Sequence, residues 1–137
     1  MSKWIKCETA MPPEHETIFA KLKGTDKGGF GYMKLWVDDI RPAPEGYRWY
    51  KSVNAVKCAI RNIESCYWHT RNELYRIELI DIDHDAGDYA HLGGDYIELL
   101  KWFEETERNY PIRIHSMNTV GAANMRRIIE HNGWTEV

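Results

Sequence analysis

The stretch Ile77–Asp85 (IELIDIDHD) decides the fold of this 137-residue chain. It begins as an aliphatic run typical of a strand and ends in acidic residues and a histidine. Two other stretches also pass from apolar to polar residues: Lys34–Asp39 (KLWVDD) and Pro111–Ser116 (PIRIHS). Short apolar runs of this kind favour buried strands. Each stretch therefore predicts a strand with an apolar interior and a polar carboxyl end.

Helix-like segments separate these strands. A further predicted strand, Tyr47–Lys51, is followed by Ser52, a suitable N-cap residue, and Asn118 and Gly133 are suited to begin and end the last helix. Apolar residues recur at helical spacing in three segments: Val53, Val56, Ala59, Ile60 and Ile63; Tyr96, Leu99, Leu100 and Phe103; Ala122, Met125 and Ile129. This alternation predicts an α/β fold with a mostly parallel sheet flanked by helices. Trp134–Val137 is expected to add a final short strand.

One connection departs from this pattern. The segment between Lys34–Val37 and Tyr47–Lys51 contains Pro42 and Pro44, which favour extended backbone. It is shorter than the crossover of about a dozen residues that normally joins parallel strands. Either this proline-rich loop returns in extended form and replaces the first crossover helix, or the two strands are antiparallel.

The glycine-rich stretch 23–31 divides the chain into an N-terminal extension, residues 1–32, and a main body, residues 33–137. The extension is too short to form a core alone. We expect Ile18–Leu22 to add an edge strand to the sheet or to meet a second subunit in a homodimer.

Composition excludes several classes of function. The net charge of −3 argues against non-specific nucleic-acid binding, which needs a basic face. No apolar run approaches the roughly 18–20 residues of a membrane span, and the N-terminus lacks the apolar core of a signal peptide. We therefore expect a cytoplasmic protein with no membrane contact.

The residues suited to chemistry follow the predicted strands. In an open parallel sheet, ligands bind beyond the carboxyl ends of the strands, where Asp38, Asp39 and Asp83 would meet. Carboxylate oxygens suit Mg²⁺, so these residues predict a divalent-metal site that could polarise a phosphoryl oxygen. The alternative is that they form only solvated turns and caps.

His84 and His115 stand at the ends of two of these strands. Imidazole titrates near neutral pH, so two histidines can serve as general base and general acid at a cyclic phosphodiester. Asp83 and Asp85, on either side of His84, complete the predicted catalytic set. A histidine at a strand end also often bonds only the backbone, and for His115 that alternative stays open.

Four residues are candidates for binding the phosphate: Arg41, Ser116, Asn118 and Gly121. Ser116 and Asn118 can donate hydrogen bonds to phosphoryl oxygens. They also precede a predicted helix, whose N-terminus favours anions.

Three blocks of sequence carry a resemblance: Leu35–Pro42 (LWVDDIRP), Ile82–Asp88 (IDHDAGD) and Arg113–Gly121 (RIHSMNTVG), the last followed by Asn124 and Met125. Together they resemble the cyclic-phosphate-processing receiver domain, over roughly Met33 to Val137. The resemblance implies a receiver-like, flavodoxin-type sheet with an acidic pocket at its carboxyl edge.

The resemblance also implies roles for individual residues. Asp38 and Asp39 match the metal-binding acidic pair of receivers, Asp83 matches the aspartate that receivers phosphorylate, and Ser116 matches the small hydroxyl residue after the fourth strand. His84 and His115 are what this family adds, and they underlie its proposed action on cyclic phosphates.

Some residues depart from the family pattern. Thr119 stands where the family usually has proline, and Ala86 where leucine is common. Asp81 adds a carboxylate on the strand face of Asp83, where burial would demand a partner or a raised pKa. No residue near the C-terminus matches the late-strand lysine of receivers. The N-terminal extension, through Trp4–Lys6, Met11–Glu14 and Thr17–Ala20, resembles the opening of a small domain of unknown function seen in phage and bacterial proteins.

These observations predict a small phosphoesterase acting on a cyclic phosphate of a nucleotide or an RNA end. Two alternatives use the same pocket or fold. The pocket captures a nucleotide signal without consuming it, as a phage-encoded sponge would, or the chain is a degenerate receiver that acts through protein contacts.

Overall fold

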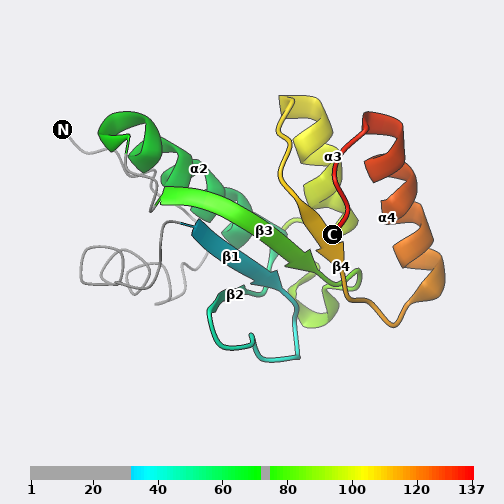
Figure 1. Ribbon diagram of the computed structural model, residues 1–137. Coiled ribbons are helices and arrows are strands. Elements are labelled where there is room, and N and C mark those ends of the chain that lie inside the picture. Colours follow the sequence, from blue (N-terminus) through cyan, green and yellow to red (C-terminus); the bar gives the residue numbers. More distant parts are fainter. Residues whose placement is uncertain (1–31, 72–74) are drawn as a thin grey trace.

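The computed structural model describes residues 32–71 and 75–137, so the predicted N-terminal extension and its edge strand lie outside the described part apart from Tyr32. The strands are β1 (Tyr32–Val37), β2 (Tyr47–Tyr50), β3 (Arg76–Ile82) and β4 (Ile112–Ile114). The helices are α2 (Val53–Thr70), α3 (Ile97–Thr106) and α4 (Thr119–Asn132), with the short 3₁₀ helix η3 at Gly87–Tyr89 (Figure 1).

The four strands form one parallel sheet in the order β2-β1-β3-β4. Register aligns the carboxyl ends of the strands, because Val37 lies opposite both Tyr50 and Ile82, and Ile82 lies opposite Ile114. This order and direction confirm the expectation of a receiver-like α/β fold. The expected final strand is reduced to a single β-bridge between Ile112 and Glu136.

The proline-rich loop joins β1 to β2 without a helix, and the antiparallel alternative is wrong. Because β2 has only four residues, the loop needs to return about 13 Å, well within the reach of an extended chain. Two indole groups hold this loop: Trp36 Nε1 donates to the carbonyl of Arg41 at 2.8 Å, and Trp49 Nε1 donates to the carbonyl of Asp38 at 2.7 Å.

Local capping sets the helix boundaries, as predicted. Ser52 Oγ accepts the N–H of Ala55 at 3.1 Å at the start of α2. Asn118 Oδ1 accepts the N–H of Gly121 at 2.8 Å at the start of α4, and Gly133 ends that helix at φ 69°. Among the described helices, none has the length and apolar character that a bilayer span demands.

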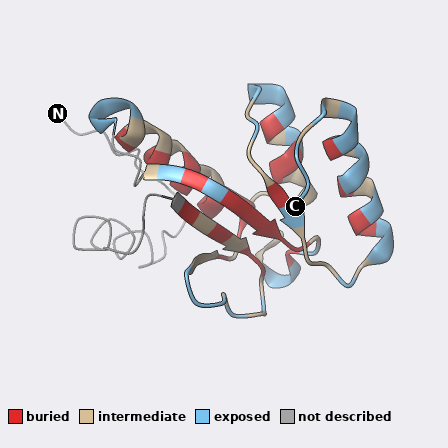
Figure 2. Ribbon diagram, in the orientation of Figure 1, coloured by how far each residue is buried: buried red, intermediate tan, exposed pale blue. Residues whose placement is uncertain are grey.

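A single hydrophobic core lies between one face of the sheet and the three helices (Figure 2). Leu35 and Val37 from β1 and Ile80 and Ile82 from β3 face it. The helices add Ile60, Leu99, Phe103 and Met125, among others. Strand side chains alternate between faces, so the intervening residues of β1, β3 and β4 point to the opposite face of the sheet.

Candidate functional site

Three carboxylates meet at the carboxyl edge of the sheet. Asp38 and Asp39 directly follow β1, and Asp83 directly follows the neighbouring strand β3. One oxygen of each lies within 4.8 Å of the others. From β1 the chain first adds β2 on one side and then β3 on the other, so the strand order changes direction between β1 and β3. Open α/β sheets bind ligands at such switch points. The structure thus brings together the three residues predicted as metal ligands.

Asp38 is 1% exposed, and both of its carboxylate oxygens have partners. Its Oδ1 accepts the backbone N–H groups of Ile40 at 2.9 Å and Arg41 at 2.8 Å. Its Oδ2 lies 2.9 Å from His115 Nε2 and 3.2 Å from Arg41 Nε. Burial alone would raise the pKa of Asp38, but these hydrogen bonds and the Arg41 charge hold it below its ordinary value of 3.8. Asp38 is therefore a carboxylate.

The pKa of Asp39 is shifted in the opposite direction. Burial, followed by the charges of Asp38, Asp83 and Asp85, raises its pKa above 3.8. Gly87, at φ +54°, leaves room for it, because a Cβ there would lie 2.2 Å from Asp39 Oδ2. Sequence reasoning assigned Gly87 no role; a glycine close after the Asp-His-Asp block was the available signal.

Arg41 bridges the acidic cluster. Besides Asp38, it contacts Asp83 Oδ2 through a terminal guanidinium nitrogen at 3.4 Å. The other oxygen of Asp83 accepts the backbone N–H of His84 at 2.7 Å. The Arg41 side chain is 43% exposed, so part of its guanidinium faces solvent beside the carboxylates.

The ring of His84 bonds Asp85 and packs directly against Gly121. Its Nδ1 lies 2.8 Å from Asp85 Oδ1, and Asn118 Nδ2 donates to both oxygens of Asp85 at 3.2 and 3.3 Å. The bond with His84 is the main cause of the lowered pKa of Asp85. A Cβ on Gly121 would lie 2.4 Å from His84 Cγ, so the absence of a side chain there makes room for the ring.

Ser116, Asn118 and Gly121 lie together where β4 leads into α4. Ser116 Oγ accepts the N–H of Asn118 at 3.0 Å. The N–H of Gly121 is already donated to Asn118 Oδ1 within the helix cap. Of the four residues predicted to bind phosphate, Asn118 and Gly121 therefore lie beside His84, Ser116 is bonded to Asn118, and Arg41 lies beside Asp38 and Asp83.

His115 is bonded at both nitrogens. Its Nδ1 lies 2.7 Å from Asp81 Oδ1, and its Nε2 lies 2.9 Å from Asp38 Oδ2. Trp36 stacks on the ring, with centroids 3.9 Å apart and planes 5° apart. Burial alone would lower the pKa of His115, but the bonds to Asp81 and Asp38 raise it above 6.5. The ring is therefore best described as an imidazolium donating to two carboxylates.

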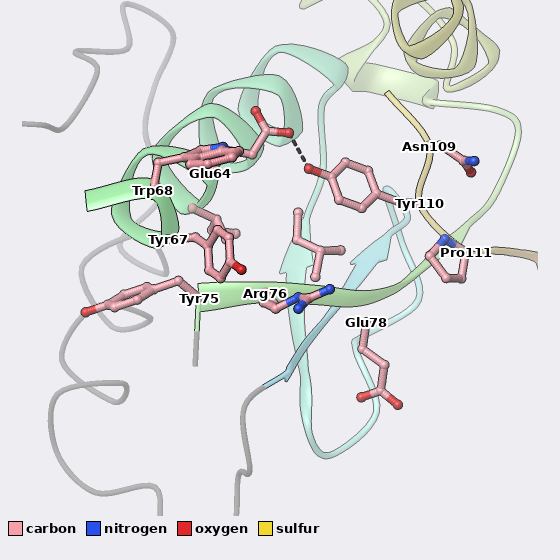
Figure 3. A pocket seen from close by; sticks show the side chains of 11 residues that line it. Glu64, Tyr67, Trp68, Tyr75, Arg76, Glu78, Asn109, Tyr110 and Pro111 are labelled. Carbon is pink, nitrogen blue, oxygen red and sulfur yellow. Dashed lines mark hydrogen bonds between the residues drawn. The ribbon is translucent and has the colours of Figure 1, made fainter. Parts of the chain in front are cut away.

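A cavity of about 490 Å³ lies elsewhere, at the amino ends of β3 and β4 (Figure 3). Its lining is aromatic, with Tyr67, Trp68, Tyr75 and Tyr110, and Tyr110 donates a hydrogen bond to Glu64. None of the predicted site residues lines it. At the acidic edge, it is the convergent charged groups that mark the candidate site.

A comparison with protein families agrees with this geometry. The family model described as the cyclic-phosphate processing receiver domain matches residues 33–131. No curated protein and no solved structure matches the chain. The family match begins in β1, ends in the last turn of α4 and includes the three carboxylates and both bonded histidines. The chain therefore belongs to the family of cyclic-phosphate processing receiver domains.

Proposed function

We propose that the chain is a phosphoesterase that hydrolyses a cyclic phosphate of a nucleotide or an RNA end at the carboxyl edge of the sheet. One observation carries this proposal. Two histidines, each bonded through Nδ1 to an aspartate, border the cluster of Asp38, Asp39 and Asp83. Opening a cyclic phosphodiester needs one group to take a proton from water and another to protonate the leaving oxygen.

In this proposal Asp38, Asp39 and Asp83 hold a divalent cation, for which Mg²⁺ is the best match. The donor set fits, because three carboxylate oxygens lie within 4.8 Å of one another and hard cations prefer such ligands. In this proposal the cation takes the place of the Arg41 guanidinium between Asp38 and Asp83. Their crowding also contributes to the raised pKa of Asp39, and a cation would relieve it. When bound, the cation would neutralise this charge and polarise a phosphoryl oxygen.

His84 is the proposed general base. With Nδ1–H donated to Asp85, the lone pair of Nε2 is available, and Nε2 bonds no residue in the described ranges. Water attacks phosphorus while Nε2 takes its proton, and one P–O bond of the ring breaks. The departing alkoxide needs a proton, and the imidazolium of His115 is the proposed donor. Its Nε2–H breaks the hydrogen bond to Asp38 Oδ2 and protonates the alkoxide.

Arg41, Ser116 and Asn118 are the proposed positioning groups for the phosphate. Arg41 offers the half-exposed guanidinium beside the carboxylates. Ser116 uses its oxygen as an acceptor from Asn118 N–H, so its hydroxyl hydrogen remains available for a phosphoryl oxygen. Gly121 contributes by seating His84.

The test is turnover of defined substrates by the full chain. The panel contains 2′,3′-cyclic and 3′,5′-cyclic mononucleotides, cyclic dinucleotides and RNA ending in a 2′,3′-cyclic phosphate, each with Mg²⁺ or with EDTA. Phosphorus NMR follows conversion of the cyclic ester to the monoester. We expect turnover with Mg²⁺ and its loss in His84→Ala and His115→Gln, with His131→Ala, an exposed histidine at the end of α4, as the matched control.

Two results would replace this proposal. A ligand that binds tightly and is recovered intact after long incubation would identify a capture protein. Absence of both binding and turnover across the panel would favour a degenerate receiver that acts through protein contacts. Full activity of His115→Gln would remove His115 from the reaction.

A further inference from the structure

Asp81 has no part in the reaction proposed above, yet it is one of the most buried polar residues, at 2% exposed. A buried carboxylate is costly unless it is bonded and paired. It lies on β3, on the sheet face opposite the hydrophobic core, since its strand neighbours Ile80 and Ile82 both face the core. The partners that stabilise the buried Asp81 carboxylate should therefore indicate its role.

Among residues 32–71 and 75–137, Asp81 has three side-chain partners: His115, Tyr47 and Arg113. Oδ1 bonds His115 Nδ1 at 2.7 Å, while Oδ2 accepts from the hydroxyl of Tyr47 at 3.3 Å and from Arg113 at 3.3 Å. Arg113 also reaches the Tyr47 hydroxyl at 3.4 Å. The carboxylate is thus fixed on one side and bonds the imidazole on the other.

Strand pairing assembles this arrangement from all four strands. Trp36 on β1 lies opposite Asp81 on β3, and Asp81 lies opposite Arg113 on β4. Tyr47 comes from β2. We call Trp36, Tyr47, Asp81 and Arg113 the His115 platform.

The platform restrains one face and one edge of the His115 ring. Trp36 covers one ring face at a centroid distance of 3.9 Å, and its own indole is anchored by the 2.8 Å bond to the carbonyl of Arg41. Asp81 holds the Nδ1 edge. With Nδ1 held in this way, the opposite ring nitrogen, Nε2, faces Asp38 and the acidic cluster.

We propose that the His115 platform is a positioning device and that Asp81 is its central positioning residue, holding His115 so that Nε2 is presented to the acidic edge. The catalytic consequence rests on the proposed function, whereas the placement of the ring does not. A carboxylate on Nδ1 is a general means of fixing which imidazole nitrogen is presented to a reacting group.

The test compares Asp81→Asn and Asp81→Ala with Glu78→Gln, which changes an exposed carboxylate of the same strand. Nitrogen-15 NMR of the imidazole rings reports on ring placement independently of activity. We expect the His115 ring-nitrogen signals to move in both Asp81 variants while those of the other five of the six histidines stay in place. Tyr47→Phe, which removes only one hydroxyl, should give a smaller shift of the same signals.

Turnover supplies the second readout. A misplaced acid should lower kcat by roughly 10- to 100-fold with little change in KM, and Mg²⁺ affinity should stay within about twofold. Unmoved His115 signals in a folded Asp81→Asn protein would overturn the inference, and if that variant does not fold, unmoved signals in Tyr47→Phe would do so. If the wild-type chain hydrolyses none of the cyclic phosphates in the panel, the proposed function fails, and the NMR comparison still decides the role of Asp81.

Discussion

Adding one methyl group at Gly121 is expected to displace the ring of His84. The ideal position of the new Cβ lies 2.4 Å from His84 Cγ, 2.6 Å from Cδ2 and 2.7 Å from Nδ1. Carbon atoms in contact stay about 3.5–4.0 Å apart. Either the ring or the start of α4 must therefore move by about 1 Å.

Two opposing contributions set the size of the effect. Forcing a methyl group into filled space costs about 1–3 kcal/mol. Replacing a helical glycine with alanine normally stabilises a protein by about 0.5–1 kcal/mol. For Gly121→Ala the clash should win or nearly balance the gain, and the free energy of unfolding should fall by about 0–2 kcal/mol.

Removing the ring should reverse the sign. In a His84→Ala background the clash is absent, so Gly121→Ala should stabilise the protein by about 0.5–1 kcal/mol. The coupling between the two positions is then about 1–3 kcal/mol, well above the error of a double-mutant cycle. Urea denaturation of the four proteins measures it, and Ala123→Gly, at an exposed position of α4, measures the intrinsic alanine–glycine difference in this helix.

Equal effects of Gly121→Ala in the two backgrounds would refute the reasoning. That result would mean that His84 does not rest on Gly121, and the proposed orientation of its Nε2 would lose its support. A loss of stability that persists without the ring would point instead to strain in the α4 backbone.

Three other predictions concern the cap, the metal and the effect of pH. Ser52→Ala should lower the free energy of unfolding by about 1 kcal/mol, because it removes the bond to the N–H of Ala55, whereas Ser52→Gly should cost only a few tenths; equal losses in urea denaturation would contradict this. Asp83→Asn should weaken Mg²⁺ binding by at least roughly tenfold in titration calorimetry, with exposed Asp88→Asn as the control, and unchanged affinity would rule Asp83 out as a ligand. Since the pKa of His115 is raised above 6.5, the stability it contributes should be complete below pH 6.5 and should decrease as pH rises through the folded-state pKa. In the absence of divalent cations, the urea denaturation midpoint should therefore fall less with rising pH in His115→Gln than in the wild-type chain. The same dependence on pH in both proteins would argue against a raised pKa of His115.

Residue types and spacing were enough to predict the local features of this protein. Ser52 and Asn118 begin helices, and Gly133 ends one, through hydrogen bonds and backbone angles that involve only nearby residues. The apolar-to-polar change along β1 and β3 also predicted that Asp38 and Asp83 would meet, because parallel strands present their carboxyl ends at one edge. This part of the site follows from strand direction alone.

Other features required the tertiary structure. The direction of β2 stayed open until its pairing with β1 was known, since a short extended loop fits either direction. Gly87 and Gly121 make room for Asp39 and His84, and such contacts between distant segments leave no periodic pattern.

The bonding of His115 is the clearest case of a feature that only the folded chain decides. The sequence alone indicated that His115 stands at a polar strand end and that Asp81, if buried, needs a partner. It did not indicate that the two are bonded, or that Trp36 stacks on the ring. Those contacts depend on the register of three strands, and a shift of one residue would turn Asp81 to the other face of the sheet. Register is set by packing of the whole core, so the chemistry of His115 is a property of the tertiary structure.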